Sequence, residues 1–356
     1  MILESLILKN YRSYESLSVK FAGGVNILQG KNAAGKTNAL EAIGFLSFGR
    51  SFRTQKDSEC VREGSESAYI RGCVTKSCGG LAVEALLSTL ERKSLKINGE
   101  PVKKLGNLFG NFIAIVFCPE DMKMLKESPS LRRRFLDIEI SKLKPPYFYE
   151  LQEYQKALAQ KNALLKSKIK EPQLKKLVSI YNEQLASHGE KIIAARQAFT
   201  ERLSEKARGI HKDLSGGESL SLKYRASVSS GEIKQALFDR MEKSFPSEIE
   251  QGFCLYGPHR EDMAAFLDGN EIKPFSSQGQ IRTATLSMKL ATMAVANEDS
   301  GESAVLLLDD VFSELDESRQ AALIERVQGA QCFITTATKI KNATGKTYTV
   351  ANGTIT

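Results

Sequence analysis

The chain of 356 residues is 42% hydrophobic and 26% charged, which is typical of a globular protein with one large or two ordinary domains. It has no apolar run of about 18 residues, and Glu4 interrupts the first apolar stretch, so we exclude a membrane span and a signal peptide and expect a cytoplasmic protein. The net charge is +8, and six scattered cysteines without a CxxC pair favour reduced thiols over zinc or a disulfide framework.

Two strands, at 2–8 and 17–28, are expected before the first motif, GKNAAGKT at residues 30–37. This is the GxxxxGKT spacing of a P-loop, in which backbone N–H groups surround phosphates, the lysine pairs with their charge and the hydroxyl binds Mg²⁺. A helix predicted from residue 38 places its N-terminus at the phosphate. The expected ATP-binding residues are Gly30, Lys31, Asn32, Ala33, Ala34, Gly35, Lys36 and Thr37, with Lys36 also catalytic and Thr37 a metal ligand.

A polar segment at residues 50–54 follows the predicted helix, and it either reaches a phosphate or only caps the loop. Alternating apolar residues in three segments between residues 68 and 97 then predict an antiparallel sheet, with Asn98-Gly99 as a tight turn. We therefore expect a P-loop lobe with a β-rich extension rather than a uniformly alternating α/β domain.

Helical periodicity begins after residue 118 and continues to about residue 203. Two helices are expected to pair as a hairpin over about residues 147–205, each about 35 to 40 Å long at 1.5 Å per residue. Residues 123–176 contain 14 Lys and Arg against 6 Asp and Glu, an excess of 14 − 6 = +8 that equals the charge of the whole chain. Such a basic region is typical of contact with a nucleic-acid backbone, the alternative being a solvated helical face.

Beyond the arm, strands are expected at 219–228 and 263–272, with a helix at 233–245 between them. The apolar run at 305–308 ends in Asp309-Asp310, the pattern of a Walker B strand buried in a parallel sheet. The first aspartate can hold Mg²⁺ through its water shell and the second can orient or deprotonate the attacking water, so we assign Asp309 to the metal and Asp310 to catalysis. Residues 313–316 then take the place of the D-loop of an ABC-type ATPase, and 333–336 form a further buried strand.

The ABC class also requires a serine and a glycine at the start of a helix, which complete the site of the opposite subunit. Residues 214–218, LSGGE, resemble the transporter signature by letter, but an alternating strand follows them and offers no helix N-terminus to a phosphate. A second segment lies 309 − 280 = 29 residues before Asp309 and opens a predicted helix. We therefore assign the signature to Ser277, Gln278, Gly279 and Gln280.

The chain resembles the RecF family, in the SMC-like branch of ABC ATPases, almost from end to end. The matching motifs are Leu8-Lys9-Asn10-Tyr11-Arg12, the P-loop, PED at 119–121, RRRFLD at 132–137, YGPHR at 256–260, SQGQ at 277–280 with Arg282-Thr283, and 307–316. The resemblance implies ATP-dependent dimerisation on DNA, slow hydrolysis, a preference for gapped or junction DNA, and cooperation with RecR and RecO in placing RecA on gaps. It also adds Asn10 and Arg12 to the expected ATP-binding residues.

Three positions depart from the expected pattern. Phe52 stands where the family is expected to have a histidine, Asp310 stands where ABC ATPases use a glutamate, and Thr335-Thr336 stand where they have a histidine switch. A shorter carboxylate and the lack of an imidazole fit a slow, timer-like ATPase.

These features predict an α/β fold: an ABC-type P-loop ATPase head formed by 1–118 and 285–356, with a β-rich extension, and an inserted arm domain at 119–284 that carries the signature. Two subunits are expected to enclose two ATPs with Mg²⁺ and to present their basic arms to DNA. The candidate DNA contacts are Arg132, Arg133 and Arg134, some of which are alternatively structural. The rival hypothesis is the ATPase subunit of a membrane transporter, against which the basic arm and the displaced LSGGE argue.

Overall fold

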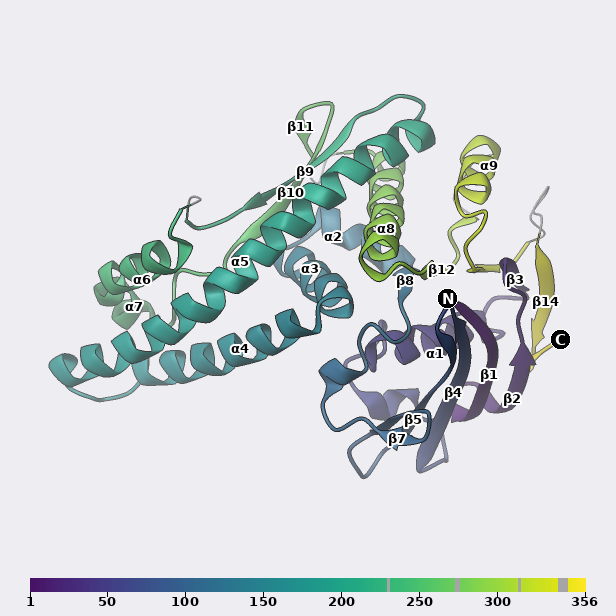
Figure 1. Cartoon of the computed structure of the whole chain (residues 1–356), viewed down its shortest axis with the longest axis horizontal. Helices are drawn as coiled ribbons and strands as arrows, with labels where there is room; N and C mark the ends of the chain where they lie inside the picture. Colours follow the sequence, from purple (N-terminus) through teal and green to yellow (C-terminus); the bar gives the residue numbers. More distant parts are fainter. Residues whose placement is uncertain (229–230, 273–275, 313–314, 339–344) are drawn as a thin grey trace. The chain divides into compact units, whose positions relative to one another are not determined.

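The computed structural model describes residues 1–228, 231–272, 276–312, 315–338 and 345–356. The chain divides into two compact units, each assembled from separate parts of the sequence (Figure 1). Unit 1 comprises Met1–Met122, Lys206–Ser219 and Ser276–Thr356, and unit 2 comprises Lys123–Glu205 and Leu220–Phe275. Among the described residues, no helix has the length and apolar character needed to cross a membrane.

The first sheet of unit 1 is antiparallel, with strand order β2-β1-β4-β5-β6-β7. Its strands are β1 (Ile2–Tyr11), β2 (Tyr14–Lys20), β4 (Ser67–Lys76), β5 (Gly79–Ser88), β6 (Ser94–Ile97) and β7 (Glu100–Pro101). Burial alternates along β4, as expected for a sheet with one covered face. Asn98 and Gly99 have φ values of 51° and 86°, so the predicted tight turn between β6 and β7 is confirmed.

The second sheet of unit 1 has strand order β15-β14-β3-β13-β12-β8, and all pairs except β14 with β15 are parallel. Its strands are β3 (Val25–Gln29), β8 (Ala114–Phe117), β12 (Val305–Leu308), β13 (Cys332–Thr336), β14 (Lys346–Ala351) and β15 (Thr354–Ile355). Every residue of β8, β12 and β13 is buried, which explains why β8 and β12 are apolar throughout and why β13 is apolar up to its two terminal threonines. Because these strands are parallel, the carboxyl ends of β3, β13 and β12 lie at one edge of the sheet.

Three longer helices lie in unit 1: α1 (Lys36–Phe48), α8 (Gln278–Ser300) and α9 (Glu317–Arg326). Unit 1 also contains three 3₁₀ turns, η1 (Asp57–Cys60), η2 (Leu105–Asn107) and η3 (Pro119–Met122). Helix α1 packs against the first sheet so closely that a Cβ on Gly72 of β4 would lie 2.4 Å from a Leu46 methyl. The P-loop helix is therefore held by the antiparallel extension as well as by the parallel sheet.

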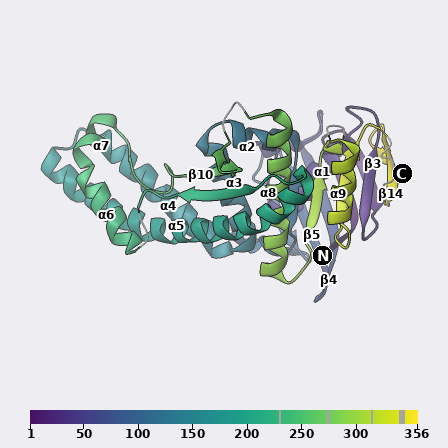
Figure 2. The ribbon, with the colours of Figure 1, turned by 90° about the horizontal axis from the view of Figure 1, so that it is seen from above.

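Unit 2 is built on a helical hairpin and a small sheet of order β11-β10-β9. Its elements are α2 (Lys123–Lys126), α3 (Pro129–Leu143), α4 (Pro145–Leu165), α6 (Ile233–Lys243), α7 (Phe245–Gln251), β9 (Leu220–Arg225), β10 (Asp262–Leu267) and β11 (Asn270–Glu271), together with most of α5 (Glu171–Ser215). Figures 1 and 2 show α4 and the first half of α5 side by side, with α6 and α7 beside their common turn. A cluster of Leu165, Leu174, Val178 and Phe245 fixes α7 to that turn.

The predicted hairpin exists, but the predicted length of its second helix is wrong. Helix α5 has 45 residues, or about 68 Å at 1.5 Å per residue, and not the expected 35 to 40 Å. The apolar seam continues past the expected end through Leu203, Ala207, Ile210 and Leu214, all buried and spaced by four, three and four residues.

The units also divide the chain differently from the predicted domains. Residues 119–122, 206–219 and 276–284 were expected in the inserted arm domain, whereas they belong to unit 1. For residues 276–284 the reason is the continuity of α8, which begins at Gln278 and cannot be divided at residue 284. The candidate signature therefore belongs to the same unit as the P-loop.

Candidate nucleotide site

The segment between β3 and α1 has the backbone of a phosphate-binding loop. Gly35 has φ 106° and precedes α1 directly, and Ala33 also has a left-handed φ of 64°. A Cβ on Gly30 would lie 2.2 Å from the Val350 carbonyl oxygen, so only glycine fits there. Strand, loop and helix follow one another as predicted, with the α1 amide groups at the end of the loop.

Lys36 lies inside this loop with only 8% of its surface exposed. Its ammonium donates to the carbonyl oxygens of Gly30 and Lys31, each at 2.8 Å. Burial lowers the pKa of Lys36, while the carboxylates of Asp310 and Asp309 act in the opposite direction. The loop is thus closed around a cation, and the side chain of Lys31 points outward by contrast, being exposed.

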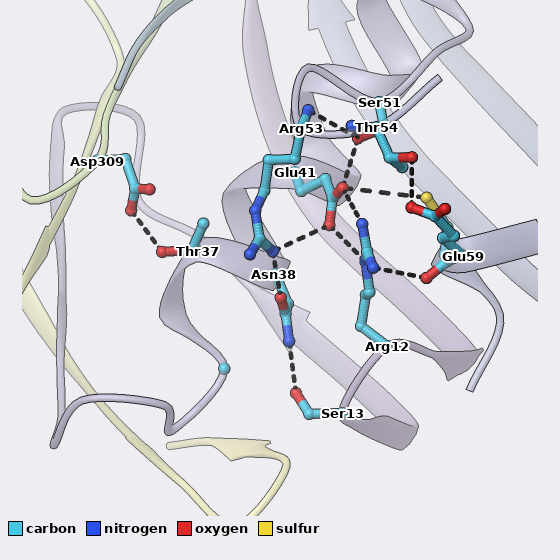
Figure 3. Close-up of polar contacts among 12 residues, drawn as sticks. Arg12, Ser13, Thr37, Asn38, Glu41, Ser51, Arg53, Thr54, Glu59 and Asp309 are labelled. Carbon is cyan, nitrogen blue, oxygen red and sulfur yellow. Dashed lines mark hydrogen bonds and ion pairs between the residues drawn. The ribbon is translucent and has the colours of Figure 1, made fainter. Parts of the chain in front are cut away.

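Asp309 follows β12 and lies beside the first turn of α1. Its Oδ1 accepts hydrogen bonds from Thr37 Oγ1 at 2.8 Å and Thr335 Oγ1 at 2.7 Å. Burial raises the pKa of Asp309, whereas these two hydroxyl donors lower it. The contact between Thr37 and Asp309 joins segments 272 residues apart and brings the P-loop and Walker B motifs together, as Figure 3 shows.

Asp310 is exposed and has a left-handed φ of 50°. Its amide donates to Thr335 Oγ1 at 2.8 Å, so the same threonine supports both aspartates. Thr336 instead bonds to residue 338, with its hydroxyl donating to the Thr338 carbonyl oxygen at 2.8 Å. Of the predicted D-loop, residues 313 and 314 lie outside the described residues.

A buried carboxylate that the sequence analysis missed, Glu41, organises the surroundings of the first turn of α1. Arg12 donates to it through Nε and Nη2 at 2.9 and 2.7 Å, and Ser51 donates at 2.5 Å. Arg53 lies 3.6 Å from the same carboxylate and donates to Asn38 Oδ1 at 2.9 Å (Figure 3). The sequence feature that could have indicated this buried carboxylate is the position of Glu41 between the apolar residues Leu40 and Ala42.

The two residues that the family resemblance adds to the site are engaged by protein groups. Besides Glu41, Arg12 donates to the Glu59 carbonyl oxygen at 2.6 Å. Asn10 has φ 49°, and its carbonyl oxygen accepts from the Arg62 amide at 2.8 Å. Their contact with ATP stays a prediction.

Ser277 is the N-cap of α8, with the reciprocal contacts of a capping box. Its hydroxyl accepts from the Gln280 amide at 3.1 Å, and Gln280 Oε1 accepts from the Ser277 amide at 3.3 Å. Ser277 and Gln278 are exposed at the start of a 23-residue helix. The predicted signature thus has an accessible helix N-terminus, which is suited to an anion.

The competing LSGGE segment has the opposite polarity. It begins in the last turn of α5, and Gly216 and Gly217 follow with φ values of 77° and 131°. A helix C-terminus offers carbonyl oxygens and repels phosphate. This polarity excludes LSGGE as the signature more strongly than the alternating strand that follows it in the sequence does. Glu218 Oε1 accepts a hydrogen bond from Gln280 Nε2 at 2.8 Å, so this segment helps to hold Gln280 of the candidate signature in place.

The arginine triplet of α3 is mostly engaged within unit 2. Arg132 makes a bidentate ion pair with Asp262 at 2.7 and 2.8 Å, and Arg133 donates to the Glu261 carbonyl oxygen at 2.8 Å. Burial lowers the pKa of Arg133. Arg134 is the exposed member. Arg132 and Arg133 therefore have a structural role, which was the alternative to DNA contact for some members of the triplet.

The YGPHR segment is likewise internal to unit 2. His259 Nδ1 lies 2.6 Å from the Tyr154 hydroxyl, and Nε2 lies 3.1 Å from the Cys254 carbonyl oxygen. Burial lowers the pKa of His259 to about 4, so the ring is neutral at pH 7. Arg196, 2% exposed, donates to Asp137 at 2.7 Å and to the Pro258 carbonyl oxygen at 2.7 Å. These motifs hold α3, α4 and α5 to the sheet of unit 2.

The exposed charge of unit 2 gathers instead at the turn between α4 and α5. We call this set the arm tip: Lys166, Lys168, Lys170, Lys175 and Lys176. All five are exposed, and within the described part of the chain none is in an ion pair. Other exposed lysines of unit 2, such as Lys156 and Lys191, pair with glutamates. The arm tip is a concentrated positive surface held in place by the cluster around Leu165.

Three comparisons place this geometry among known proteins. A family model described as RecF/RecN/SMC N terminal domain matches residues 2–352. The DNA replication and repair protein RecF of Clostridium acetobutylicum is 40% identical over 337 residues, which cover 94% of this chain and 92% of that protein. A solved structure of the recombination mediator protein RecF with ATP, in the RecFOR pathway, has a TM-score of 0.92 and 35% identity, covering 100% of this chain and 97% of the other.

A more distant structure bears on the fold alone. The Smc head domain of Pyrococcus furiosus, with an extended coiled coil, has a TM-score of 0.58 and 17% identity over 99% of this chain and 95% of that one. Together with the closer matches it confirms the predicted fold class, an ABC-type ATPase head with a β-rich extension and an inserted helical arm.

Proposed function

This chain belongs to the RecF family of DNA replication and repair proteins, and on that basis we propose that it binds DNA under the control of ATP, as a dimer. The membership confirms the family resemblance found in the sequence and disfavours a transporter ATPase. The observation that carries the proposal is the 2.8 Å contact between Thr37 and Asp309, which joins the two halves of an ATPase site.

In this proposal ATP binds at Gly30–Thr37, with Lys36 and the α1 amide groups facing its phosphates. A family structure described as holding ATP supports this assignment. The donor set at the site fits Mg²⁺, because a hydroxyl and a carboxylate oxygen are hard ligands and the buried Asp309 has two hydroxyls as hydrogen-bond partners. Thr37 and Asp309 would hold the ion, which neutralises phosphate charge when bound.

Asp310 is our candidate for the residue that orients or deprotonates the attacking water. It is exposed directly after the carboxyl end of β12, and its amide donates to the Thr335 hydroxyl, which holds the backbone at this edge of the sheet. A carboxylate that is one methylene shorter than glutamate reaches the water less well, which supports slow hydrolysis. Slow turnover would make ATP hydrolysis a timer for release of DNA.

The signature at Ser277, Gln278, Gly279 and Gln280 is proposed to complete the site of a second subunit. The exposed, capped N-terminus of α8 supports this role. ATP would then stabilise the dimer because its terminal phosphate has partners on both chains. Partnership with RecR and RecO is proposed from the family structure described as belonging to the RecFOR pathway, and cooperation with RecA from the family resemblance alone.

DNA contact is assigned to the exposed positive charge of unit 2, which means the arm tip and Arg134 rather than the whole arginine triplet. Lysine side chains that lack carboxylate partners attract phosphates without competition from the protein. This interaction is independent of base sequence and suits a protein that recognises a DNA structure.

A first prediction concerns the arm tip. Changing Lys168, Lys170 and Lys176 together to glutamine should weaken binding to gapped DNA and make it less salt-dependent, with the slope of log K against log salt falling by about one for each phosphate that the protein no longer neutralises. ATP hydrolysis without DNA should be unchanged, whereas its stimulation by gapped DNA should disappear. Fluorescence anisotropy over a salt series and a steady-state ATPase assay measure these quantities.

The matched control removes the same charge from unit 1 by changing the exposed residues Lys20, Lys96 and Lys103 to glutamine. It should leave the salt slope close to that of the unmodified protein. Equal effects of the two triple variants would mean that net charge and not the arm tip governs DNA binding. An ATPase that gapped DNA never stimulates would contradict the proposed function itself.

A further inference from the structure

The carboxylate of Glu41 is wholly buried one helical turn beyond Thr37, on the helix that the P-loop opens. Its closest hydrogen-bond and ion-pair partners come from two places in the chain: Arg12 at the turn after β1, and Ser51 and Arg53 in the segment after α1. A buried carboxylate is stable only when such partners compensate its lost hydration. Glu41 therefore binds two separate segments to the nucleotide helix.

The two arginines are held with different strength. Arg12 makes a bidentate pair at 2.9 and 2.7 Å, and its side chain is 20% exposed. Its hydrogen bonds to Glu41 raise the pKa of Arg12, as expected for a tightly held guanidinium. Arg53 lies 3.6 Å from the carboxylate, and its side chain is 42% exposed. Arg12 is thus fixed, whereas Arg53 can exchange partners.

The charges do not balance, because two guanidiniums share one carboxylate. Arg53 holds Asn38 Oδ1 at 2.9 Å, in the first turn of α1, and its charge lowers the pKa of Asp309. Figure 3 shows its guanidinium between Glu41 and Asn38. The surplus positive charge lies next to the turn where a phosphate would bind.

Ser51 links the Glu41 carboxylate to the backbone of the segment that carries Arg53. Its hydroxyl donates to Glu41 at 2.5 Å and accepts from the amides of Arg53 and Thr54 at 2.9 and 3.1 Å. The direction of the segment that carries Arg53 is therefore set by the carboxylate. Loss of the carboxylate would release the segment as well as the side chain.

We propose that Glu41 is a positioning residue that presents Arg53 to the terminal phosphate of the bound nucleotide and so distinguishes ATP from ADP. The inference rests on the proposed ATP site. Glu41 itself touches no nucleotide; it keeps Arg12 in place and orients the Ser51–Arg53 segment, from which Arg53 moves to the more negative ligand.

The test is a double-mutant cycle on equilibrium affinity for ATP and for ADP. Glu41→Gln should weaken ATP binding about tenfold, the loss expected for a misplaced charge-assisted contact, while ADP affinity changes much less. Arg53→Gln should have the same effect, and the double variant should be no worse than Arg53→Gln alone. Competition with a fluorescent nucleotide measures both affinities.

Ser51→Ala keeps the inference testable if Glu41→Gln does not fold. It removes the hydroxyl between Glu41 and the Arg53 amide and should lower the ATP-to-ADP affinity ratio in the same direction. Equal losses for ATP and ADP, or additive losses in the double variant, would overturn the inference and assign Glu41 a purely structural role. Failure of the unmodified protein to bind ATP would instead refute the proposed function.

Discussion

Replacing Lys36 with alanine is expected to lower the affinity for nucleotide about 100-fold or more, which abolishes binding at ordinary nucleotide concentrations. The ammonium lies within the loop, 2.8 Å from the Gly30 and Lys31 carbonyl oxygens, and it is a buried cation inside the segment proposed to bind phosphate. Alanine removes both the charge for the phosphates and the contacts that close the loop, and charge-assisted hydrogen bonds contribute about 1.5 to 3 kcal/mol each. Equilibrium binding of a fluorescent ATP analogue measures the loss.

Lys31→Ala is the matched control, because it removes an exposed lysine from the same loop. Its nucleotide affinity should stay close to that of the unmodified protein. If Lys36→Ala bound ATP as well as Lys31→Ala does, the nucleotide would have to bind elsewhere. A thermal melt of both variants checks that the fold persists.

Replacing Ser277 with arginine should separate nucleotide binding from its consequences. The side chain at this exposed N-cap contacts Gln280 of its own helix, so ATP affinity should be preserved. A cation at the start of α8 would disrupt the proposed contact with the ATP of a second subunit and oppose the helix dipole at a cost of about 1 kcal/mol. ATP-dependent dimerisation and hydrolysis should both be abolished, as gel filtration and an ATPase assay would show.

Ser215→Arg in the LSGGE segment is the control for this variant. Residue 215 ends α5, where a positive charge is favourable, so the change should leave dimerisation intact. Dimerisation of the Ser277 variant with ATP, or its loss in the Ser215 variant, would reverse the assignment of the signature.

The sequence predicts the nucleotide site well where the signal is local or repeats a pattern. A strand, a glycine loop and a helix follow one another around Gly30–Thr37, and each is recognisable within a few residues. The sequence also predicts that Asp309 lies at the same edge of the sheet, because the fully apolar strand before it is expected inside a parallel sheet, next to β3 or to a neighbour of β3. The Thr37–Asp309 contact follows from these two facts.

The sequence does not reveal the pairing of charged residues across long intervals. Arg132 belongs to a positive run that resembles a DNA contact, but its partner Asp262 lies 130 residues later. Glu41 is similar, because Arg12 and Arg53 approach it only after the sheet and α1 have packed. Charge patterns along the chain cannot distinguish a solvent-facing cation from one that a distant carboxylate neutralises.

The length of α5 does not follow from the sequence, for a different reason. The expected end of α5 lay near Leu203, where the polar residues of the next turns weaken the pattern, although the buried seam continues to Leu214. That continuation carries the chain out of unit 2 and back into unit 1, which is also why the predicted domain boundaries differ from the observed ones.

The central claim is that each ATP is completed by two chains, and a mixing experiment with the Lys36→Ala and Ser277→Arg variants tests it directly. Each variant alone should be inactive. In a mixed dimer, the intact P-loop of one variant would meet the intact signature of the other, so ATP hydrolysis should return and rise with protein concentration. If the mixture stayed as inactive as its components while the unmodified protein hydrolysed ATP, the site would not be shared between subunits.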